Sequence, residues 1–97
     1  MSEVDVESVA RITGESEEEV VRRGLESYVE SELRQCRARV KELEREYGVG
    51  SLEELENEVE SGGVEEHPAW EAVIEWRNLK DRIERLVSRR KVIEDAK

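Results

Sequence analysis

Side chains suited to nucleophilic, redox or metal chemistry are scarce in this sequence of 97 residues. The one cysteine, Cys36, cannot form a disulfide or a thiolate metal cluster within the chain, and the one histidine, His67, excludes a site with two imidazoles. Three glutamates lie close to this histidine in the sequence, Glu65, Glu66 and Glu71, and could coordinate a hard cation. Helical carboxylate sites, however, need Glu and His side chains that project inward from several facing helices, and no such pattern exists here. We therefore expect no catalytic, cofactor-binding or metal-binding residue and no enzyme activity.

Charged side chains are abundant and unevenly distributed. Asp and Glu number 26 against 16 Lys and Arg, and the net charge of −10 argues against direct binding of nucleic acid or of an anionic membrane surface. Between Glu46 and Trp76 the sequence has ten glutamates and no Lys or Arg. This acidic connector, residues 46–76, is either solvated surface or a surface that docks on a basic protein, and the sequence leaves both interpretations open.

Helix start and stop signals divide the chain into four helices and no strand. A short N-terminal helix ends at Gly14, which suits the left-handed position after a helix. A capping box at Ser16–Glu19 opens a long helix that runs to Tyr47. A second capping box, Ser51–Glu54, opens a short acidic helix, and Pro68 suits the first position of a final long helix.

The two long helices place apolar residues at the spacing of a coiled-coil seam. From Val29 onward the steps are 4, 3, 4, 3 and 4. The seam consists of Val29, Leu33, Cys36, Val40, Leu43 and Tyr47. The final helix repeats this spacing from Val73 to Ile83, so we expect it to fold back antiparallel onto the seam, with Trp76 in the core. The first long helix should be about 45–50 Å long, which is too long for a compact monomer of this size.

The first 28 residues present a different apolar face. The apolar phase slips between Tyr28 and Val29, so the first half of the long helix is rotated relative to the seam and has no partner within the chain. We expect two chains to associate through Val9, Ile12, Val21, Leu25 and Tyr28. The predicted fold is therefore all-α, an elongated antiparallel helical hairpin with short extra helices that forms a homodimer. It is a single helical domain, residues 1–97, with dimerisation helices in 1–28 and the hairpin, including the acidic connector, in 29–97.

Residues 9–29, VARITGESEEEVVRRGLESYV, resemble the two-helix part of ribbon-helix-helix proteins. In that family a Thr-Gly-x-Ser turn precedes a helix of the form Glu-Val-Val-Arg-x-x-Leu-x-x-Tyr, and many small prokaryotic antitoxins use this dimeric scaffold. The resemblance implies dimerising helices. The family's basic DNA-reading strand has no counterpart in residues 2–5, which are Ser, Glu, Val and Asp, so the resemblance does not extend to direct operator binding.

The rest of the chain is similar to the C-terminal half of small archaeal and bacterial antitoxins of type II toxin–antitoxin pairs. The similarity lies in residues 46–55, EYGVGSLEEL, in the acidic glycine-containing link that follows, and in residues 70–79 with their two tryptophans. This resemblance implies a protein that neutralises a cognate toxin, typically encoded beside it, through its acidic C-terminal half.

We therefore expect a non-catalytic protein-interaction module, an antitoxin whose acidic connector and last helix occlude a basic toxin surface. The expected partner contacts are Leu52, Leu55, Val59 and Trp70. A structural helical adaptor and a DNA-binding transcriptional regulator remain as alternatives. Because no apolar run of about 18 residues exists and the first residues are acidic, we expect a cytoplasmic protein without a membrane partner. Few Asn, Gln and Cys beside abundant Glu and Arg also fit a heat-adapted prokaryote.

Overall fold

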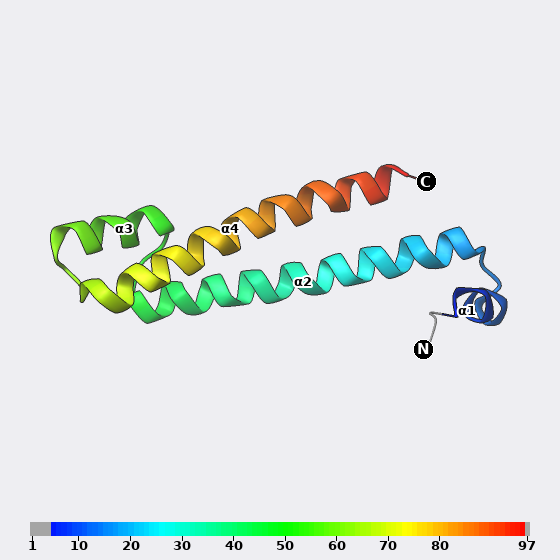
Figure 1. Cartoon of the computed structure of the whole chain (residues 1–97), viewed down its shortest axis with the longest axis horizontal. Helices are drawn as coiled ribbons and strands as arrows, with labels where there is room; N and C mark the ends of the chain where they lie inside the picture. Colours follow the sequence, from blue (N-terminus) through cyan, green and yellow to red (C-terminus); the bar gives the residue numbers. More distant parts are fainter. Residues whose placement is uncertain (1–4, 97) are drawn as a thin grey trace.

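The computed structural model describes residues 5–96, and every regular element in this part of the chain is a helix. The helices are α1 (Val6–Thr13), α2 (Glu17–Tyr47), α3 (Leu52–Ser61) and α4 (Glu66–Asp95). Figure 1 shows α2 and α4 running antiparallel along the molecule, with α3 against α4 at one end and α1 beside the start of α2 at the other. This architecture confirms the predicted all-α, elongated helical hairpin with short extra helices.

Side-chain caps begin α2 and α3 where the sequence predicts them. The Ser16 hydroxyl accepts a hydrogen bond from the Glu19 amide (3.1 Å), and the Ser51 hydroxyl accepts one from the Glu54 amide (3.1 Å). The return bond of the second box is displaced by one residue, because the Glu54 carboxylate accepts from the Gly50 amide (2.7 Å). These bonds satisfy amides that have no partner inside a helix, so local sequence alone places the two helix starts.

The connection between α2 and α4 departs slightly from the prediction. Gly48 ends α2 with a φ of +63°, a conformation that glycine adopts without strain. Helix α4 begins at Glu66, so Pro68 is the third residue of the helix and not the first, as predicted. It still lies in the first turn, where backbone amides have no partner inside the helix, so its missing N–H costs no hydrogen bond. The Tyr47 hydroxyl donates to the Pro68 carbonyl oxygen (3.2 Å) and joins the end of α2 to the start of α4.

The core lies at the end of the hairpin where α2, α3 and α4 meet. Its buried residues are Leu43, Val49, Leu55, Val59, Ala69, Ala72, Val73 and Trp76. Trp76 is only 4% exposed, which confirms the prediction that it belongs to the core. Along the rest of the hairpin Val29, Leu33 and Cys36 are also buried, and they belong to the predicted seam of α2.

The half of the hairpin away from α3 has only two layers. No residue of α4 after Trp76 is buried within the described range, and its seam residues there are half-buried. The radius of gyration is 19.2 Å, whereas a compact domain of this length would have about 12.5 Å. Since a pair of helices buries only one stripe of each partner, this half of the molecule leaves apolar surface open.

Three ion pairs between α2 and α4 fix the register of the hairpin. They are Arg39–Glu75 (2.6 and 2.8 Å), Arg82–Glu32 and Arg90–Glu30 (2.9 Å). Partly exposed pairs of this kind contribute little net stability. Spaced along both helices, however, they would all be broken by a shift of one helix along the other.

Replacing Trp76 by alanine should lower the free energy of unfolding by about 3–5 kcal/mol, because the change leaves a cavity in the core. Ile74 is a matched control on the same helix, since it is 55% exposed. Ile74→Ala should change stability by less than about 0.5 kcal/mol. Urea denaturation followed by circular dichroism measures both effects, and equal losses would contradict this location of the core.

Candidate protein-interaction surfaces

The acidic connector surrounds the core end of the hairpin and is largely unneutralised. Two of its ten glutamates form ion pairs with arginine, Glu56 with Arg77 and Glu75 with Arg39, and a third, Glu71, lies 3.8 Å from the His67 ring. Seven more are exposed and form no ion pair with another described residue: Glu46, Glu53, Glu54, Glu58, Glu60, Glu65 and Glu66. Like charges gathered at one end repel one another, and a basic partner would relieve that repulsion.

The four predicted partner contacts differ in how accessible they are to another protein. Leu55 is fully buried and Val59 is nearly so, because the apolar side of α3 packs on α4, and neither is accessible to a partner, contrary to the prediction. Leu52 and Trp70 are half-buried and pack against the core. Only these two therefore remain candidates for contact with another protein.

Leu52 lines an open groove of about 410 Å³ where α2, α3 and α4 meet. The side chains that line it with Leu52 are Val40, Glu44, Ser51, Trp76, Lys80, Ile83 and Glu84. The groove thus combines an apolar floor with a charged rim. The sequence predicts Val40 and Ile83 only as residues of the seam between the long helices. The structure shows that both are half-buried and line this groove.

A bidentate ion pair lies between the acidic connector and the seam. The Arg39 guanidinium donates two hydrogen bonds to Glu75, and these bonds hold the pKa of the Glu75 carboxyl below its usual value. Burial opposes this shift but is the weaker effect. Glu75 in turn raises the pKa of Arg39, so the pair remains charged across the neutral range.

All five predicted dimer contacts are exposed in the single chain. They are Val9, Ile12, Val21, Leu25 and Tyr28. Tyr28 is exposed while the next residue, Val29, is buried, as the phase slip in the sequence indicates. Ile74 and Val92 of α4 are exposed as well, and the apolar periodicity missed them because they lie outside the stripe with steps of three and four. Association with a second chain remains a prediction.

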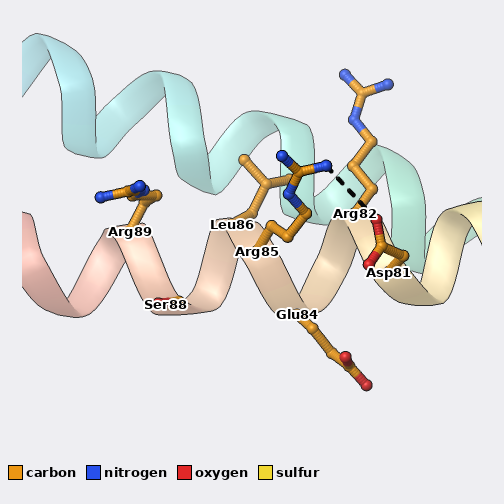
Figure 2. Close-up of a pocket in the computed structure, with 7 residues that line it drawn as sticks. All are labelled: Asp81, Arg82, Glu84, Arg85, Leu86, Ser88 and Arg89. Atoms are coloured by element: carbon orange, nitrogen blue, oxygen red, sulfur yellow. Dashed lines mark ion pairs between the residues drawn. The ribbon is translucent and has the colours of Figure 1, made fainter.

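A hollow of about 600 Å³ along α4 is lined mainly by charged residues. Figure 2 shows Arg82 and Arg85 projecting from one side of α4, while Glu84 points away from it. Arg85 pairs with Asp81 (3.6 Å) and Arg82 pairs with Glu32 of α2. Since two of its three guanidinium groups already face carboxylates, this hollow does not favour an anionic ligand.

The residues with potential for metal or thiol chemistry lie apart from one another. Cys36 is buried in the seam, and His67 is exposed near Glu71, with 3.8 Å between Nδ1 and Oε1. No group of three or more His, Cys, Asp or Glu within residues 5–96 has the arrangement of a metal site. None of the helices formed by these residues is both long and apolar enough to span a membrane.

Comparison with protein families places the chain among its relatives. The model of the family described as "Uncharacterized protein MJ0235 family" matches residues 1–96. The chain belongs to this family. Because the match spans all four helices, the acidic end and the exposed apolar end are parts of one MJ0235 family unit. No curated protein and no solved structure matches the chain.

The Arg39–Glu75 pair should make stability depend on pH. The pKa of Glu75 is lowered in the folded state, so its stabilisation is complete above the unfolded pKa of about 4.3 and is lost as the pH falls through the lower folded value. Glu75→Gln should therefore lower the free energy of unfolding at pH 7, and this difference from the wild type should shrink between about pH 5 and pH 3.

Glu53→Gln is the matched control, because it removes an exposed carboxylate of the same connector that forms no ion pair within the described residues. Urea titrations at several pH values measure both variants. A Glu75→Gln effect that stays constant with pH, or that Glu53→Gln reproduces, would contradict the role given to the ion pair.

Proposed function

We propose that this member of the MJ0235 family is a non-catalytic protein-interaction module that binds a basic protein through its acidic end. The observation that supports this function is the concentration of ten glutamates, without a single Lys or Arg, in residues 46–76. Most of them are exposed and form no ion pair within the described range. A surface with one sign of charge accelerates encounter with an oppositely charged partner and disfavours acidic ones.

The groove beside Leu52 gives this acidic end an apolar anchor point. Specific interfaces combine a few buried apolar anchors with a polar rim. An apolar side chain of the partner would contact Val40, Leu52 and Ile83, which line the groove and are half-buried, and α3 with its exposed glutamates lies beside it. Trp70 at the same end is half-buried and offers a second apolar contact.

The specific form of this function that we favour is that of an antitoxin that occludes a basic toxin surface. Its support is the resemblance of residues 9–29 to ribbon-helix-helix proteins and of residues 46–79 to antitoxins, together with the charge of the connector. We place this binding in the cytoplasm, where the lone Cys36 would stay reduced. A helical adaptor with a different basic client would use the same surface.

Co-expression with the product of the adjacent reading frame tests this function. We expect the two proteins to purify as one complex, and we expect this chain to rescue a growth defect caused by the neighbour alone. Separate elution of the two proteins beside a harmless neighbour would overturn the antitoxin form.

Charge reversal then tests the surface. The double change Glu53→Lys and Glu60→Lys on α3 should weaken the complex by roughly tenfold or more, because it places positive charge opposite a basic partner. The control is Glu94→Lys with Asp95→Lys, which makes the same change in net charge on exposed positions of α4 that lie outside both the connector and the groove. Calorimetric titration measures both, and equal weakening would contradict a partner site at the acidic end.

A further inference from the structure

The single chain exposes more surface than its mass requires. Its accessible surface is 7217 Å², whereas a compact monomer of this mass would expose about 5,700 Å². The excess of about 1,500 Å² is larger than the roughly 800 Å² that each partner buries in a standard specific interface. Five of the seven large apolar side chains exposed among the described residues lie on α1 and the first half of α2.

An open groove of about 640 Å³ lies at this end of the hairpin. Its apolar lining comes from three helices and consists of Val6 of α1, Val21 and Leu25 of α2, and Val92, Ile93 and Ala96 at the end of the chain. Figure 1 shows this end as the one where the start of α2 and the end of α4 lie, with α1 beside it. Nothing within the described residues fills the groove.

The same end also presents a projecting apolar residue. Ile12 on α1 is 82% exposed, and Val9, one turn earlier on the same face, is exposed too. An aliphatic projection and an aliphatic groove on one end of one molecule are the two halves of a self-complementary contact. A two-fold axis would allow each copy to insert its projection into the groove of the other, as isologous interfaces do.

Charges around these features are complementary as well. Glu17 and Glu18 line the groove, are exposed and form no ion pair with a described residue. Arg11 directly precedes Ile12, and its one ion pair within the described range, with Glu7, is fully on the surface. An α1 helix that enters the groove of another copy therefore brings a cation to an unpaired acidic rim.

We infer that the occupant of this groove is a second copy of the chain, with α1 exchanged between the two molecules. Ile12 of each copy lies among Val21, Leu25 and Val92 of the other, and Arg11 faces Glu17 and Glu18. The α1 helix of the second copy then forms a third layer on this end of the hairpin, as α3 does at the opposite end. This interface is separate from the acidic partner surface, so either can fail without the other.

Sedimentation equilibrium of the purified full chain and its variants tests the inference. We expect a dimer for the wild type and an increase in the dissociation constant of about 30-fold or more for both Ile12→Glu and Leu25→Glu. Ile74→Glu is the matched control, since Ile74 is about as exposed as Leu25, 55% against 48%, but does not line the groove. Unchanged helicity by circular dichroism shows that each variant folds.

A charge exchange tests the contact without removing apolar surface. Arg11→Glu should weaken the dimer by placing like charges together, and Arg11→Glu combined with Glu17→Arg and Glu18→Arg should restore it. A monomeric wild type would overturn the inference. A dimer insensitive to Ile12→Glu, or a triple variant no better than Arg11→Glu alone, would overturn the exchange of α1.

Discussion

Two paired helices can bury only part of their apolar surface, and this limit explains how the rest of the molecule is arranged. Each helix of an antiparallel pair covers only one stripe of its partner. Apolar residues outside that stripe are buried only if a third element packs on them. Helix α3 provides that element at one end, where Leu55 and Val59 complete a core around Trp76. At the other end α1 packs mainly on α2 within the described part of the chain, and the apolar side chains there remain exposed.

Charge divides the molecule along the same axis. The core end is surrounded by the acidic connector, while residues 77–97 have an excess of basic over acidic side chains. The Arg77–Glu56 pair joins these two regions and the Arg39–Glu75 pair joins the connector to α2, but much of the connector's negative charge stays unpaired within the described residues and is available to another molecule. One end of the hairpin is thus suited to a basic partner and the other to an apolar one.

Local signals in the sequence were sufficient for most of the fold. Ser16 and Ser51 cap their helices, and the spacing after Val29 identifies the seam, because each signal acts over a few residues. Accessibility was harder to predict. The stripe of α3 that contains Leu55 can face either its own chain or a partner, and the periodicity is identical in both cases. The groove lined by Leu52 and Ile83 forms between helices that are distant in the sequence, so no local sequence pattern predicts it.

In the dimer that we propose, a second copy covers the open end of the hairpin and the acidic end stays free. Hydrogen–deuterium exchange of the purified chain at a series of concentrations tests both parts at once. We expect amides in residues 9–28 to exchange more slowly as the protein concentration rises, and the exchange of amides in residues 46–76 to stay unchanged. Protection that rises with concentration in the connector instead, or in neither segment, would contradict it.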